Sequence, residues 1–146
     1  MVFASFNIGK KHMTEHHFNW SSEVRGYETD FQGIVNNAVY FNYLDHTRCL
    51  QLAHLGVDIK TCAENQLNLV LIHTELSYKH SLTVHDSFLI HSIMTRLSPL
   101  KYAFAQSIRL RKDNRLILTA NSICCGVNAQ SGKPCVVPQL AFLLRS

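Results

Sequence analysis

The sequence predicts an α+β domain in which a mostly antiparallel sheet packs against one long central helix. Three observations lead to this fold class. An apolar pattern with a period near 3.6 residues runs from residue 37 to 55, four strand-like segments follow it, and the joints between those segments are short. Joints of hairpin length cannot form the crossovers that parallel strands need, so we expect the strands to be antiparallel.

The expected elements follow one another in a simple order. A first strand over residues 18–26 is succeeded by a polar loop over residues 27–36. Asn36 or Asn37 can cap the long helix, and Gly56 follows its last turn as a stop signal. After a short irregular stretch over 57–68, which has room for a helical turn, we expect strands over 69–79, 86–97, 101–111 and 115–127.

Length and composition indicate one globular domain. The chain has 146 residues, of which 47% are hydrophobic, and this is enough material for a full core. Asn7 and Lys10 interrupt the apolar character that a secretory signal would need, and no apolar run has the length of a membrane span. We expect an N-terminal arm of uncertain order over 1–13, a folded domain over 14–146, and a soluble, cytoplasmic protein.

Charge and ligand spacing exclude several classes of function. The net charge of +4 is mild and is not concentrated in a block, whereas dedicated nucleic-acid binders are usually more basic. The five cysteines form no C-x-x-C motif, and the nine histidines have no H-E-x-x-H spacing. We therefore expect reduced thiols, no metal site and no nucleic-acid partner.

The segment from Val24 to Arg48 carries the strongest functional signal. It reads Asp-Phe-Gln-Gly-Ile-Val at positions 30–35 and continues as Asn-Asn-Ala-Val-Tyr at the helix start, with an acidic residue and an Arg later on the helix. This pattern resembles the signature of the 4-hydroxybenzoyl-CoA thioesterase-like family, and weaker similarity extends over residues 16–138. Within the family it looks most like the acyl-lipid and dihydroxynaphthoyl-CoA thioesterase branches. The resemblance implies a hot-dog fold, in which the sheet wraps around the central helix.

The resemblance also implies roles for four residues. Asp30 would act as general base or nucleophile, and the backbone N–H of Asn37 would polarise the thioester carbonyl. Gly33 would allow a close approach to the substrate, and Arg48 could line the pocket. The residue types suit this chemistry, because a loop carboxylate can activate water while free amides at a helix start stabilise an oxyanion. The alternatives are that Asp30 and Gly33 only form a turn, and that Asp45 and Arg48 are an exposed ion pair.

A CoA or phosphopantetheine arm would arrive as part of the substrate, so no separate cofactor is expected. Its phosphates need cations, and we select Arg96 and Lys101, which flank the Ser98-Pro99 turn, because the corresponding turn in the family lies near the cofactor. The basic hairpin over residues 109–115 is the alternative, although such tips are usually only solvated.

The predicted function is hydrolysis of an acyl-CoA to a carboxylic acid and free CoA. One alternative is an acyl-carrier-protein thioesterase, whose basic rim would meet an acidic protein. A second is a non-catalytic module that binds acyl thioesters. A dehydratase is disfavoured because its family pattern uses a loop histidine, and none lies between His17 and His46. We also expect a homo-oligomer, with four subunits favoured over two, because the sheet would otherwise keep an open edge.

Overall fold

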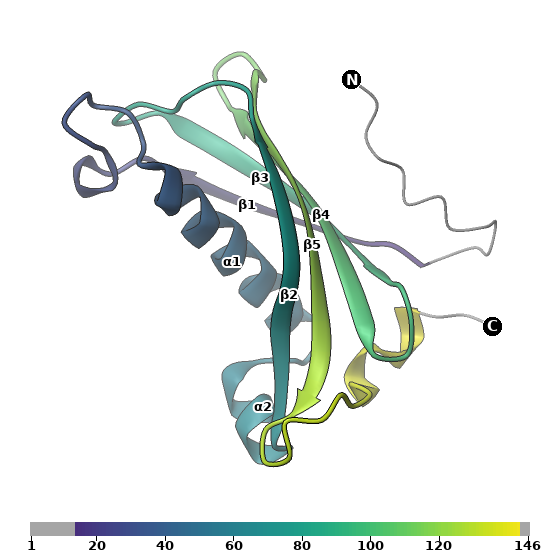
Figure 1. The fold of residues 1–146 in the computed structure, drawn as a ribbon. Coiled ribbons are helices and arrows are strands. Elements are labelled where there is room, and N and C mark those ends of the chain that lie inside the picture. Colours follow the sequence, from purple (N-terminus) through teal and green to yellow (C-terminus); the bar gives the residue numbers. More distant parts are fainter. Residues whose placement is uncertain (1–13, 144–146) are drawn as a thin grey trace.

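The computed structural model describes residues 14–143, so the predicted arm over residues 1–13 lies outside the described residues. Five strands form one sheet in the order β1-β3-β4-β5-β2, and each neighbouring pair is antiparallel. Helix α1 crosses one face of this sheet, which curves around it (Figure 1). The predicted α+β fold class is confirmed. In chain order the elements are β1 (His16–Glu23), η1 (Gly26–Glu28), α1 (Asn37–His54), α2 (Ile59–Glu64), β2 (Leu67–Tyr78), β3 (Ser87–Arg96), β4 (Lys101–Leu110), β5 (Leu116–Asn128) and η2 (Pro138–Leu143).

Local signals define both ends of α1. The side chain of Asn36 accepts a hydrogen bond from the Ala38 N–H at 3.0 Å, so Asn36 is the N-cap. Gly56 has φ of +86° just after the helix, a conformation that favours glycine and ends the helical run. Within residues 14–143, no helix combines the length and the apolar character needed to cross a membrane.

The first strand begins and ends earlier than predicted. It starts at His16, and its last pair with β3 joins Glu23 to Ser87. Beyond Glu23 the chain turns into η1, and this is why the predicted end at residue 26 is wrong. The short helix α2 occupies part of the irregular stretch, at the place where a helical turn was allowed for.

Two hydrophobic clusters form the interior. The first core lies between the N-terminal half of α1 and the sheet, and Tyr40, Tyr43 and Leu44 are its helix residues. The second core lies near the other end of the sheet, where the C-terminal segment places Val137 and Leu140 against it.

A polar layer continues the buried face of α1 beyond the first core. Thr47, Arg48 and Gln51 are buried on the helix, whereas Cys49 and Ala53 are exposed, although both are within the apolar pattern from residue 37 to 55. The facing strands contribute three buried polar residues, Ser92, Gln106 and Ser122. Each helix residue therefore needs a hydrogen-bond partner, because an unpaired polar group in the interior costs free energy.

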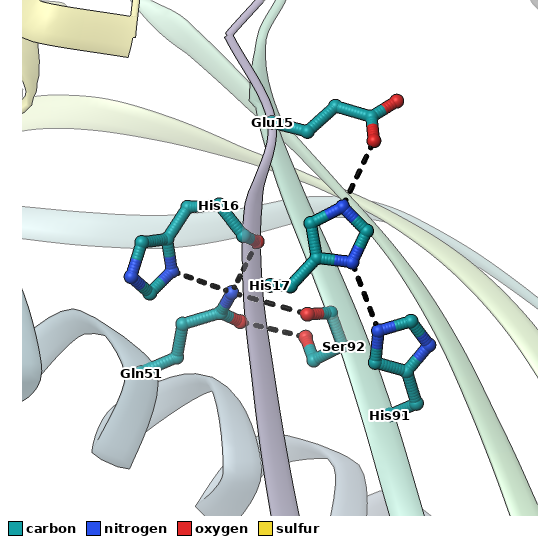
Figure 2. A network of polar contacts seen from close by, with 6 residues as sticks. All are labelled: Glu15, His16, His17, Gln51, His91 and Ser92. Atoms are coloured by element: carbon teal, nitrogen blue, oxygen red, sulfur yellow. Dashed lines mark hydrogen bonds and ion pairs between the residues drawn. The ribbon is translucent and has the colours of Figure 1, made fainter.

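The Gln51 contact is the tightest part of this layer (Figure 2). The Ser92 hydroxyl donates to the Gln51 Oε1 at 2.6 Å, and the Gln51 Nε2 donates to the His16 carbonyl at 3.0 Å. The same Nε2 lies 3.2 Å from the Nδ1 of His16, which must be unprotonated to accept this bond. Desolvation by burial, then the charges of His54 and His17, lower the pKa of His16 below its ordinary value.

This geometry makes stability depend on pH. In the unfolded chain His16 takes up a proton as the pH falls through about 6.5, while the folded chain resists it. As the pH falls from about 6.5 to the lowered pKa of folded His16, the folded state should therefore lose stability. Below that pKa, His16 causes no further loss. We expect the urea midpoint of the wild type to fall over this window more than that of His16→Gln, whose amide can still accept from Gln51. A His80→Gln control, at an exposed ring, should follow the wild type, and parallel curves for all three would contradict the role of His16.

The two edges of the sheet differ in character. At the β2 edge, Val70 and Leu71 are each 42% exposed and Ile72 is 50% exposed, beside an irregularity in the pairing with β5. At the β1 edge, the outward side chains include His17, whose Nδ1 lies 3.0 Å from the His91 Nε2. The β2 edge is thus an apolar strand edge without a partner strand among the described residues.

Candidate active site

Asp30 lies in a small hairpin that leads into α1. A bridge pairs Thr29 with Val35, and the Asp30 N–H donates to the Ile34 carbonyl at 2.9 Å. The Asp30 Oδ1 accepts the Gln32 N–H at 2.8 Å. This bond is expected if Asp30 only stabilises a turn, which was the alternative to a catalytic role. Its other oxygen, Oδ2, has no hydrogen bond among the described residues. The turn therefore uses only one of the two carboxylate oxygens.

Gly33 makes the hairpin possible. Its φ of +79° is in the left-handed region, where a side chain is disfavoured. The Gly33 N–H donates to the Asp30 carbonyl at 3.0 Å and closes the turn. The structure thus gives Gly33 a conformational role next to Asp30.

The helix start presents a free amide. Asn36 fills the capping position, and within residues 14–143 the backbone N–H of Asn37 makes no hydrogen bond. The positive end of the helix dipole favours negative charge at this N–H. The Asn36 N–H donates to the Glu28 carbonyl at 3.0 Å. This bond closes the loop that contains Asp30, and Asn37 follows directly after it.

The segment between β2 and β3 supports this loop. The Val35 N–H donates to the Leu82 carbonyl at 2.9 Å, and the Leu82 N–H donates to the Tyr40 hydroxyl at 3.0 Å. Desolvation by burial raises the pKa of Tyr40, so its hydroxyl stays neutral. At the end of β2, the Tyr78 hydroxyl donates to the Asn37 carbonyl at 3.3 Å.

Arg48 does not join Asp30 and Asn37 within this subunit. It lies eleven residues beyond Asn37 on α1, which corresponds to about 16 Å along the helix axis. Its Nη1 donates to the Gln106 Oε1 at 3.0 Å, and its Nη2 lies 3.5 Å from the Asp45 Oδ1. The pair with Asp45 exists, but the Arg48 side chain is 8% exposed and that of Asp45 is 69% exposed, so the pair is not the exposed one considered as an alternative.

Arg96 and Lys101 lie at the end of the sheet opposite to Asp30. Because β1 and β3 are antiparallel, Glu23 and Ser87 mark the Asp30 end, and Arg96 is at the far end of β3, about 30 Å away. The buried Arg96 guanidinium donates to the carbonyls of Ser98 at 3.2 Å, Pro99 at 3.1 Å and Ala141 at 3.4 Å. These hydrogen bonds occupy the Arg96 guanidinium. Lys101, the other cation of the predicted pair, is exposed.

The cations of the β4–β5 hairpin, by contrast, lie at the Asp30 end, because Leu110 is beside Phe88 at the start of β3. Two of them are held locally: the Arg109 Nη1 donates to the Asn114 carbonyl at 3.0 Å, and the Arg115 Nη2 donates to the Asp113 Oδ2 at 3.3 Å.

One buried acid near the loop was not singled out by sequence reasoning. Glu28 is 8% exposed and accepts hydrogen bonds from Tyr43 and from the Arg25 N–H. The sequence signal was its position two residues before Asp30, but its partner on α1 is fifteen residues away. No group of three or more His, Cys, Asp or Glu side chains within 14–143 is placed to hold a metal.

The arrangement combines a carboxylate oxygen without a partner and a free helix amide in one hydrogen-bonded loop. A carboxylate can take a proton from water or attack a carbonyl carbon, and an N–H can stabilise the oxyanion that forms. These are the two functions needed to hydrolyse an ester or a thioester.

Comparison with known proteins identifies the family. A family model described as the thioesterase-like superfamily matches residues 24–142. An Aquifex aeolicus protein named as an esterase is 30% identical over 122 residues, covering 84% of this chain and 92% of its own. The chloroplast acyl-acyl carrier protein thioesterase ATL3 of Arabidopsis thaliana is 30% identical over 115 residues, covering 79% of this chain and 60% of its own.

Solved structures share the fold. A hypothetical protein from Aquifex aeolicus has a TM-score of 0.78 at 28% identity, with 88% of this chain and 99% of that chain covered. A 1,4-dihydroxy-2-naphthoyl-CoA thioesterase from Synechocystis has a TM-score of 0.79 at 16% identity, with 85% and 91% covered. The chain therefore belongs to the thioesterase-like superfamily and is a thioester hydrolase with the hot-dog fold.

Proposed function

We propose that this protein hydrolyses an acyl-CoA to a carboxylic acid and free CoA, with Asp30 as the reacting carboxylate. As a general base, Asp30 removes a proton from water while the oxygen attacks the carbonyl carbon. The Asn37 N–H then donates to the oxyanion, the C–S bond breaks, and the thiolate takes up a proton. The observation that carries the proposal is the Asp30 Oδ2 without a partner in the same closed loop as the free Asn37 N–H.

Asp30 as a nucleophile is the other route through the same geometry. Its carboxylate oxygen attacks the carbonyl carbon, CoA leaves as the thiol, and water hydrolyses the resulting anhydride. Either route uses the Asn37 N–H in the same way. The CoA arm enters with the substrate, and no further cofactor belongs to the proposal.

An acyl carrier protein is the second candidate carrier. The observation that favours it is the 30% identity to an Arabidopsis acyl-acyl carrier protein thioesterase. Thiol release should be measured for the same acyl groups, short, long, aromatic and β-keto, on CoA and on a carrier protein. A higher kcat/KM on one carrier identifies it, whereas binding without thiol release on both would contradict the enzyme and support a binding module.

We also propose that the active form is a homo-oligomer built through β2. The apolar edge at Val70, Leu71 and Ile72 can pair with the same edge of a second copy, which satisfies its backbone groups and covers its side chains. An antiparallel β2 pair reverses one sheet relative to the other. The Lys101 end of one subunit then comes beside the Asp30 end of its partner, where Lys101 is able to meet the phosphates of the substrate. Two such dimers would make the tetramer that we favour.

A charge at this edge should weaken assembly. We expect light scattering at micromolar concentration to give two or more chains for the wild type. Ile72→Lys should raise the dissociation constant more than tenfold, because it places a charge on the paired edge. Val136→Lys is the matched control, since Val136 is 46% exposed but belongs to the C-terminal segment and not to β2. A monomeric wild type would contradict this assembly, and so would equal dissociation of both variants.

The cytoplasm is the proposed location. All five cysteines are free, and two of them, Cys124 and Cys125, are buried. Unpaired thiols are typical of a reducing compartment.

A further inference from the structure

Glu28 is a buried carboxylate that the proposed chemistry leaves unused. It is the last residue of η1, two positions before Asp30, and is 8% exposed. A carboxylate removed from water is tolerated only when hydrogen bonds and charges compensate it. Its contacts therefore indicate what holds this part of the loop.

The side chain of Glu28 connects the loop to the middle of α1. Its Oε2 accepts the Tyr43 hydroxyl at 2.5 Å and the Arg25 N–H at 2.9 Å. The Arg25 Nη1 lies 3.6 Å from the Oε1 and supplies the opposite charge. The acid is thus satisfied by one donor from the helix and two groups from its own turn.

The backbone of Glu28 closes the same loop. Its carbonyl accepts the Asn36 N–H at 3.0 Å, directly before Asn37. One residue therefore fixes both ends of the segment that holds Asp30, and its side chain attaches this closure to α1. A displacement of Glu28 would move the Asp30 carboxylate relative to the Asn37 N–H.

Tyr43 is suited to be a fixed donor. Its ring packs against Phe88 with centroids 4.6 Å apart and against Trp20 at 6.2 Å, which holds the hydroxyl in place. Desolvation by burial raises the pKa of Tyr43 far above its usual range, and the hydrogen bond and charge of Glu28 raise it further. The phenol therefore stays protonated and is able to donate to the Glu28 carboxylate.

We propose that Glu28 and Tyr43 are positioning residues for thioester hydrolysis. Their hydrogen bond sets the Asp30 carboxylate relative to the free N–H at the start of α1, and neither residue touches the substrate. This inference rests on the proposed function. The buried phenol and carboxylate keep the reacting loop residue in its correct position. This matters because a small misplacement of a reacting group costs much of the rate.

The test separates positioning from stability. Tyr43→Phe keeps the ring packing and removes only the donor, so kcat should fall about tenfold, with KM changed less than twofold. Glu28→Gln keeps an acceptor for both donors and should lose less, and the double variant should be no slower than Tyr43→Phe, because both changes act on one contact. Thr47→Val is the control: it removes another buried hydroxyl from α1, one that donates to the Tyr43 carbonyl at 2.7 Å, and should leave kcat unchanged.

Amide hydrogen exchange gives a readout that does not depend on turnover. In Tyr43→Phe the Asp30 and Asn36 amides should exchange faster, while those of the β4–β5 ladder stay protected. Wild-type kcat in Tyr43→Phe, or unchanged exchange at both amides, would overturn the inference and leave the proposed function intact. A wild-type protein that releases no thiol would instead remove the proposed function and this inference with it.

Discussion

Asp30→Asn is expected to lower kcat by two or more orders of magnitude while leaving the melting temperature nearly unchanged. The amide oxygen can still accept the Gln32 N–H, so the turn keeps its shape. The substitution removes the negative charge and the basicity of the group that activates water or attacks the thioester. General-base or nucleophilic catalysis typically contributes about 10²–10⁴ in rate, which sets the size of the expected loss.

The chain offers a closely matched control for this variant. The Asp113 Oδ1 accepts the Arg115 N–H at 3.0 Å, two residues along the chain, in the same type of turn. Asp113→Asn therefore makes the same chemical change in a similar turn, where the second carboxylate oxygen also meets the Arg115 guanidinium, and should keep wild-type kcat. If Asp30→Asn lost folding and activity together, the carboxylate would be a turn residue and not the reacting group.

Gly126→Ala is expected to destabilise the fold by about 2 kcal/mol or more, because overpacking at a rigid contact has few ways to relax. A Cβ at this position would clash with the Cys135 carbonyl oxygen and lie 3.0 Å from a methyl of Val137. Both neighbours belong to the C-terminal segment that covers the second core. The Cys135 N–H also donates to the Gly126 carbonyl at 2.9 Å, so the segment cannot move away without losing this bond.

Gly26→Ala separates this contact from the general effect of replacing glycine. Nothing lies within 4 Å of a Cβ at Gly26, and its φ is not in the left-handed region. Its unfolding free energy should change by less than about 0.5 kcal/mol, as for most surface substitutions. The urea midpoints of the two variants should differ clearly; a wild-type midpoint for Gly126→Ala would mean that the C-terminal segment does not rest on β5 in solution.

The two variants also locate different properties in the molecule. Asp30 is at the end of the sheet where α1 begins, and Gly126 is near the opposite end, under the C-terminal segment. Folded Gly126→Ala protein should therefore retain kcat, because no residue of the loop from Glu28 to Asn37 belongs to the second core of the same chain. Activity and stability are expected to respond independently to these two changes.

The local order of the chain was enough to predict the fold class, α1 and the Asp30 loop. Helical periodicity, Gly56 and the turn residues act over a few positions, so their effects can be seen directly in the sequence. Asp30 and Asn37 are only seven positions apart in the chain, and the resemblance to a known family implied roles for the same two residues. These parts depend on neighbours along the chain.

Contacts between distant segments decided the rest. Glu28 meets Tyr43 across fifteen residues, and Arg48 meets Gln106 across fifty-eight, so no local pattern shows that either charge is buried and paired. Lys101 proved to lie at the far end of the sheet from Asp30, because the direction of each strand follows from the long-range pairing of β1 with β3. Such pairings are set by the packing of the whole sheet around α1, which local propensities do not encode.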